Sequence, residues 1–74
     1  MTNKVYSVTE LVGSSEKSLE DAIENAVSTA NMTLRHLDWF EVTEIRGHIE
    51  NGKVAHYQVG MKLGLQYERK GESS

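Results

Sequence analysis

The sequence predicts an α+β domain with the element order β-α-β-β. Three observations carry this prediction: a β-branched and aromatic run near the start, an apolar stripe of helical period behind it, and two long strand candidates that meet at Asn51-Gly52. Because a chain of 74 residues has the length of one small domain, residues 1–74 are expected to share a single core.

The first two elements are separated by a short polar segment. Residues 4–12 are rich in valine and other strand-forming residues and are predicted to form a strand. Gly13-Ser14-Ser15 is expected to end that strand and to offer a serine N-cap. A helix is predicted from about residue 16 to 33, because apolar residues recur there at spacings of three and four. This stripe consists of Leu19, Ala22, Ile23, Ala26, Val27, Ala30 and Leu34.

The last two strands, residues 37–50 and 53–67, are predicted to form a hairpin, and the polar tail from Arg69 is expected to fray. A two-residue turn at Asn51-Gly52 sets Glu50 opposite Lys53, and a regular ladder follows from that pair. The ladder places Trp39 opposite Gly64, Phe40 opposite Leu63, Glu41 opposite Lys62, Val42 opposite Met61, Thr43 opposite Gly60 and Ile45 opposite Gln58.

The regular ladder also divides the hairpin into two faces. The side expected to face the helix carries Phe40, Val42, Glu44 and Arg46, and the opposite side carries Trp39, Ile45, Ile49 and Val54. A bulge, for example at Gly47, would shift the distal part by one residue. Strands of about 13 residues span ~43 Å and an 18-residue helix ~27 Å, so neighbouring subunits are expected to cover the remainder.

Composition narrows the class of protein. The chain has no cysteine, its first residues do not resemble a signal peptide, and no apolar run approaches the ~20 residues that cross a bilayer, so a cytoplasmic protein without a membrane partner is expected. The net charge of −3 and the pI near 5.5 argue against nucleic-acid binding. A core this small usually needs extra burial, which homo-oligomerisation can supply.

Two side chains are the candidates for ligand binding. Trp39, opposite Gly64, is either a flat platform for a planar ligand or a packing residue between subunits. The amide of Gln58 can pair with a pyrimidine-like edge, or it can be an ordinary surface group. Six strand residues, or ~20 Å, separate the two positions, so one ligand that contacts both requires two subunits.

Catalytic and metal sites are not expected. His36, His48 and His56 are scattered, and the regular ladder places His48 and His56 on opposite faces. Serine, histidine and aspartate show no spacing that indicates a triad, and Gly13-Ser14-Ser15 is too short for a phosphate loop. The sequence therefore indicates a binding or assembly protein and not an enzyme.

Three segments resemble the dodecins, small flavin-binding proteins of bacteria and archaea. They are Lys4-Val5-Tyr6 with Glu10-Leu11-Val12-Gly13-Ser14-Ser15, the long run from Thr33 to Val42 with Glu44-Ile45-Arg46-Gly47, and Tyr57-Gln58-Val59. The middle segment is similar to the bacterial branch. The resemblance implies a three-stranded antiparallel sheet that partly wraps its helix, a hollow homododecamer, and flavins bound as stacked pairs against tryptophans at subunit contacts.

The resemblance also implies roles for individual residues. Trp39 would be the stacking platform, Gln58 would hydrogen-bond the pyrimidine edge, and Arg46, with Glu44 in the same stretch, would lie near the ribityl or phosphate end. Gln66 stands where some bacterial relatives have a second arginine, which leaves FMN and riboflavin both open. Coenzyme A is a further ligand that the family implies, without a signature that places it here.

The function that follows from the resemblance is flavin storage, buffering and photoprotection. The alternatives are a self-assembling structural or interaction module in which Trp39 only packs subunits together, and an oxidoreductase, for which no convincing proton donor is visible in the sequence.

Overall fold

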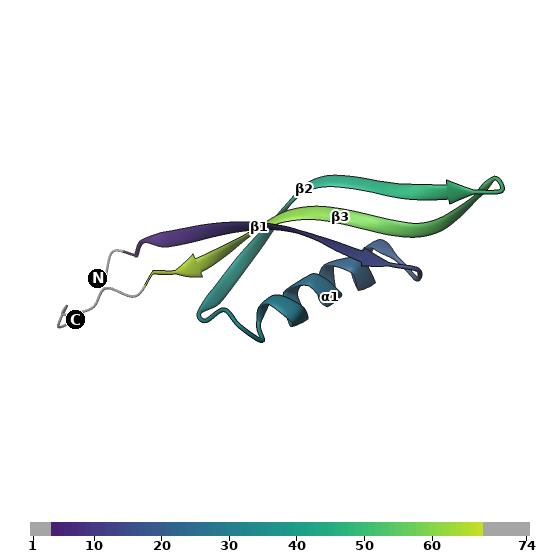
Figure 1. Ribbon diagram of the computed structural model, residues 1–74. Helices are drawn as coiled ribbons and strands as arrows, with labels where there is room; N and C mark the ends of the chain where they lie inside the picture. The colour runs from purple at the N-terminus through teal and green to yellow at the C-terminus, as the bar shows by residue number, and fades with distance from the viewer. Residues whose placement is uncertain (1–3, 68–74) are drawn as a thin grey trace.

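A computed structural model describes residues 4–67 and has the predicted α+β order (Figure 1). The sheet is antiparallel and three-stranded, with the strand order β1-β3-β2, and α1 lies on one side of it. The elements are β1 (Tyr6–Ser15), α1 (Leu19–Ala30), β2 (Leu37–Glu50) and β3 (Lys53–Gln66). The expectation for the tail from Arg69 lies outside the described residues.

The prediction that Gly13-Ser14-Ser15 ends the first strand is wrong. Strand β1 continues to Ser15, and Gly13 pairs with Val59 in the central strand. A Cβ atom on Gly13 would lie 2.2 Å from the carbonyl oxygen of Ala22 and 2.8 Å from Cβ of Ala26. The glycine is present because α1 lies directly against β1 at this point, and a side chain would separate the two elements.

Helix α1 is shorter than the predicted 16–33. Its N-cap is Ser18, whose Oγ accepts a hydrogen bond from the Asp21 amide at 3.0 Å, and not a serine of the 13–15 segment. The Ser15 hydroxyl donates to the Asp21 carboxylate at 2.7 Å instead. At the other end Leu34 still belongs to the apolar stripe, but its amide reaches the Ala30 carbonyl from a turn that follows the helix.

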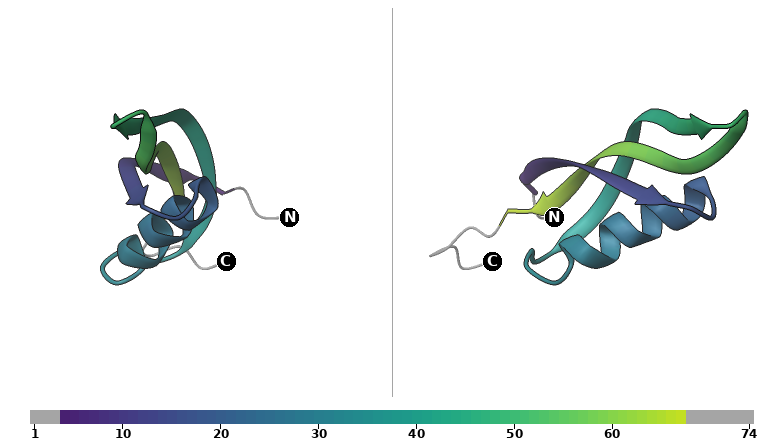
Figure 2. Two further views of the ribbon diagram at one scale, coloured as in Figure 1. Left: turned by 90° about the vertical axis from the view of Figure 1, so that its right-hand side faces the viewer. Right: turned by 45° about the vertical axis from the view of Figure 1, so that its right-hand side comes forward.

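The core is small and lies where α1 covers the middle of the sheet. Its six buried apolar residues are Ala22, Ala26 and Ala30 on the helix and Val59, Met61 and Leu63 on the central strand. The three strand side chains each contribute about 1.5–3 kcal/mol by burial. A 12-residue helix spans only ~18 Å, whereas the 14-residue strands β2 and β3 each span ~46 Å. The hairpin of β2 and β3 therefore extends beyond the end of α1 (Figure 1 and Figure 2).

The hairpin turn is confirmed, and so is the predicted ladder from Trp39 to Val42, although the register also shifts between Leu37 and Trp39. Asn51 and Gly52 have φ angles of 52° and 74°, the positive values that a type I′ turn requires. Trp39 pairs with Gly64, and Phe40 with Leu63, as predicted. The predicted bulge at Gly47 is wrong in position. The register shifts instead between Val42 and Glu44, leaving Thr43 as the extra residue, and returns between His48 and Ile49.

These two shifts correct the predicted faces of the distal hairpin. Gly60 pairs with Glu44, not with Thr43, and Gln58 pairs with Arg46, not with Ile45. Glu44 and Arg46 therefore share the face of Trp39, whereas Ile45, Ile49 and Val54 lie on the side of the helix. His48 and His56 pair directly, so the prediction that they lie on opposite faces is also wrong.

Candidate functional site

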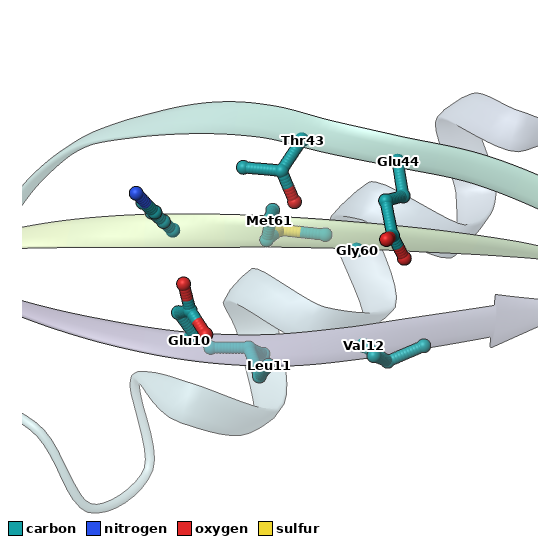
Figure 3. A pocket seen from close by; sticks show the side chains of 8 residues that line it. Glu10, Leu11, Val12, Thr43, Glu44, Gly60 and Met61 are labelled. Atoms are coloured by element: carbon teal, nitrogen blue, oxygen red, sulfur yellow. The ribbon is translucent and has the colours of Figure 1, made fainter.

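The face of the sheet that points away from α1, here called the open face, carries the candidate residues. The helix lies behind the sheet when this face is viewed from the front (Figure 3). Every second side chain of each of the three strands points to this face, except at the bulges. Its members include Tyr6, Val8, Glu10, Val12, Trp39, Glu41, Glu44, Arg46, Gln58, Gly60, Lys62, Gly64 and Gln66.

Trp39 lies flat across Gly64 at one end of the open face. A Cβ atom on Gly64 would be 2.1 Å from Cε2 and 2.3 Å from Cζ2 of the indole, so only glycine permits this position. The tryptophan is nevertheless 39% exposed, because residues 4–67 leave the outer side of its ring uncovered. The site thus presents a fixed, electron-rich plane, on which an aromatic ring can stack.

Tyr6 packs beside Trp39 and is hydrogen-bonded to Asp38. The Tyr6 ring centre is 5.9 Å from that of Trp39 with a tilt of 57°, and the phenol donates a hydrogen bond to Oδ2 of Asp38 at 2.8 Å. This hydrogen bond raises the pKa of Tyr6, with further contributions from desolvation and from the Asp38 charge. Neither residue is predicted from the sequence, although the alternation along β1 places Tyr6 on the same face as Val8 and Glu10.

An open hollow of about 570 Å³ lies on the open face. Glu10 and Val12 line it from β1, and Thr43 and Glu44 line it from β2 (Figure 3). Gly60 forms its floor, since a Cβ atom there would be 3.5 Å from both Thr43 Oγ1 and Glu44 Cβ. The bulge at Thr43 is what brings both side chains over the same glycine.

The charged candidates gather farther along the same face. Arg46 forms an ion pair with Glu44, and both side chains are more than half exposed, so the pair itself adds little stability. Arg46 also pairs with Gln58 across the ladder. Gln58 is six positions along β3 from Gly64, or ~20 Å. The structure therefore groups Glu44, Arg46 and Gln58 at one end of the open face.

Gln66 lies at the other end, near Trp39. It pairs with Tyr6, and its backbone amide donates a hydrogen bond to the His36 carbonyl at 2.9 Å.

Among residues 4–67, no group of three or more potential metal ligands gathers at one place. Within the same range, no helix has the length and apolar character needed to cross a membrane.

Comparison with known proteins gives a consistent result. Residues 5–68 match the model of the Dodecin family. A dodecin of Thermus thermophilus is 55% identical over 65 residues, which are 88% of this chain and 94% of that relative.

Solved structures agree with the sequence match. The dodecin from Streptomyces coelicolor superposes with a TM-score of 0.87 at 56% identity, covering 95% of this chain and all of the other. The dodecin from Streptomyces davaonensis superposes with a TM-score of 0.86 at 44% identity, covering 92% and 100%. In sequence and in the β-α-β-β architecture, the chain belongs to the dodecin family.

Proposed function

We propose that this protein is a flavin-binding storage, buffering and photoprotective protein. It sequesters FMN or riboflavin as stacked pairs between tryptophans at the contacts of a hollow homododecamer, acts in the cytoplasm and is not an enzyme. Family membership supports the class of function, and the position of Trp39 over Gly64 is the observation that carries it.

Trp39 suits a flavin because one side of its ring is fixed and the other is open. The sheet backbone at Gly64 supports the indole from below, so its orientation is set before a ligand arrives. Stacking on the outer side contributes about 0.5–1.5 kcal/mol per aromatic pair beyond the burial of apolar area. The indole is also an electron donor close to the ring, which would quench a photoexcited flavin.

The pyrimidine edge of the ring requires a second copy of the chain. Within one chain Gln58 lies ~20 Å from Trp39, too far for one isoalloxazine ring to contact both. A site at a subunit contact resolves this, with Trp39 of one copy below the ring and the Gln58 amide of another at its edge. The amide carries the donors and the acceptor that such an edge needs.

The other end of the ligand would meet the charged group on the open face. Arg46 would approach the ribityl chain or the phosphate, and Glu44, its ion-pair partner, would orient it. Gln66, near Trp39, offers an uncharged amide where an arginine would add a second phosphate contact. Riboflavin and FMN are therefore alternative ligands of the same site. Coenzyme A is a further ligand of the proposed assembly, with no residue assigned to it.

Self-assembly has a specific observation in its favour. Ile45, Ile49 and Val54 are exposed on the helix side of the hairpin, so α1 does not cover them. An apolar surface of this kind on a small domain marks a contact with another protein. The alternative function is a self-assembling module in which Trp39 only packs subunits together. It uses the same surface, but it predicts a protein that assembles without binding flavin.

The experiment that tests the proposal compares wild type with Trp39→Ala. FMN and riboflavin are titrated into each protein, flavin fluorescence is followed, and the size of the assembly is measured in parallel. We expect an assembled variant with at least ~10-fold weaker binding, a loss of about 1.4 kcal/mol. Met32→Ala is the matched control, because Met32 is an exposed apolar residue away from the open face. Unchanged flavin affinity in Trp39→Ala would refute the proposal that flavin stacks on Trp39. If the wild type is colourless and Trp39→Ala does not assemble, Trp39 is a packing residue between subunits.

A further inference from the structure

The two histidines of the hairpin form a pair that the proposed flavin site does not use. His48 on β2 and His56 on β3 are direct partners in the ladder, and their ring centres are 4.7 Å apart. The extra residue at Thr43 brings them into register, and the return shift follows immediately after them. Both side chains project from the open face, where the sheet backbone fixes their separation.

The spacing of the two rings suits a shared metal ion. A metal bound to one nitrogen of each imidazole at about 2.0–2.1 Å lies about 3 Å from each ring centre, so centres 4.7 Å apart are within reach of one ion. The rings are tilted by 34° to each other. His48 is exposed and His56 half-buried, so both rings have room to turn a nitrogen toward a common point.

The charges around the pair do not oppose a cation. On one side along the open face lie Arg46 and Gln58, and the Arg46 guanidinium is already paired with Glu44. On the other side lie Glu50 and Lys53, which carry opposite charges. The neighbouring charges therefore balance.

We propose that His48 and His56 chelate one late first-row divalent metal ion, with water completing its coordination. Imidazole nitrogen suits zinc, nickel and copper, and copper(II) is expected to bind most tightly in the general order of affinities. Copper(II) also accepts a tetragonal set of two nitrogens and two waters, which matches a site with only two protein ligands. The proposal is independent of flavin binding.

The test is a titration of the purified assembly with copper(II), nickel(II) or zinc(II) salts in a weakly coordinating buffer, together with electron paramagnetic resonance of the copper form. We expect one copper ion per chain and nitrogen coupling from two imidazoles. His48→Gln and His56→Gln should each lower the copper affinity at least ~10-fold, because either change leaves a single ligand.

His36→Asn is the matched control. His36 has a positive φ of 63°, which asparagine tolerates, and it lies just before β2, at the opposite end of that strand from His48. Its removal should leave the affinity unchanged. Undiminished binding in either hairpin variant, or coupling to a single nitrogen in wild type, would overturn the proposal. The nitrogen count is made on the unaltered chain, so it decides the question even where a variant does not assemble.

Discussion

The Trp39 indole rests directly on the backbone of Gly64, its partner in the β2–β3 ladder. The contact is so close that even a methyl group on Gly64 would occupy the place of the ring. A side chain at position 64 would push the indole away from the sheet or turn it aside. Gly64 therefore determines the position of the Trp39 indole, although it contributes no side chain.

Replacing Gly64 with alanine should displace the indole and weaken flavin binding. A Cβ atom 2.1 Å from the ring leaves no room for the present orientation, so we expect binding at least ~10-fold weaker by fluorescence titration. Gly60→Ala is the control on the same strand and face, because its Cβ would make only ordinary contacts of 3.5 Å. Equal affinities for the two variants would contradict the role given to Gly64.

Tyr6 should make the surroundings of Trp39 sensitive to alkaline pH. Because the hydrogen bond to Asp38 raises the pKa of Tyr6, the protonated phenol is favoured in the folded protein. The stabilisation is complete below the ordinary tyrosine pKa of about 10 and is lost as pH rises through the raised value. The fluorescence of Trp39 should therefore change above pH ~10 in the wild type, and this change should be absent from Tyr6→Phe. The same transition in both proteins would assign it to another group.

Gly13→Ala should destabilise the protein, because α1 lies against β1 there. The added methyl group meets the Ala22 carbonyl, which belongs to a rigid helix, and overpacking of this kind costs about 1–3 kcal/mol. Thermal or denaturant unfolding measures the loss. Ser14→Ala, the exposed neighbour on the same strand, should unfold like wild type. A Gly13→Ala protein as stable as wild type would mean that α1 can move away from the sheet at little cost.

Arg46→Ala should distinguish the two flavins without greatly affecting stability. The ion pair with Glu44 is exposed, so its loss should change the free energy of unfolding by less than about 1 kcal/mol. If Arg46 approaches the phosphate, FMN binding should weaken several-fold more than riboflavin binding. Lys53→Ala removes an exposed cation at the hairpin turn and serves as the control. Equal losses for FMN and riboflavin would place the arginine away from the phosphate.

Ile49→Asp should interfere with assembly. Ile49 is 74% exposed in the single chain and lies on the helix side of the hairpin, past the end of α1. A carboxylate there would be costly to bury in a subunit contact, so the assembly should shift toward smaller species in sedimentation. Met32→Asp is a comparable change at an exposed residue outside the hairpin, and it should leave the size unchanged. An intact assembly in Ile49→Asp would exclude this surface from the contacts.

The parts of the fold that could be predicted are those with a strong local cause. Asn51-Gly52 determined the turn, and counting outward from it gave the correct pairing of Trp39 with Gly64. The helical stripe likewise identified the alanines that form one side of the core.

The remaining features depend on contacts between distant parts of the chain. Nothing at Thr43 distinguishes it locally as the site of a bulge, yet the shift there moves Glu44 and Arg46 to the face of Trp39. The local sequence indicates that Gly13 breaks the strand, whereas in the structure a glycine is needed there because α1 lies directly against β1. Ser14, Ser15 and Ser18 all lie just before the helix, and only the tertiary structure selects Ser18 as the N-cap. The pairing of His48 with His56 follows from the same register shift.

The most direct test of flavin stacking on Trp39 is to titrate riboflavin or FMN into the purified wild-type assembly while following the fluorescence of Trp39 and of the flavin together. Trp39 is the chain's single tryptophan, so its emission reports on the platform alone. If flavin stacks on Trp39, both signals should show saturable quenching with the same midpoint. Flavin emission and Trp39 emission that both remain unchanged at micromolar flavin would contradict stacking, and Trp39 would then be a packing residue between subunits.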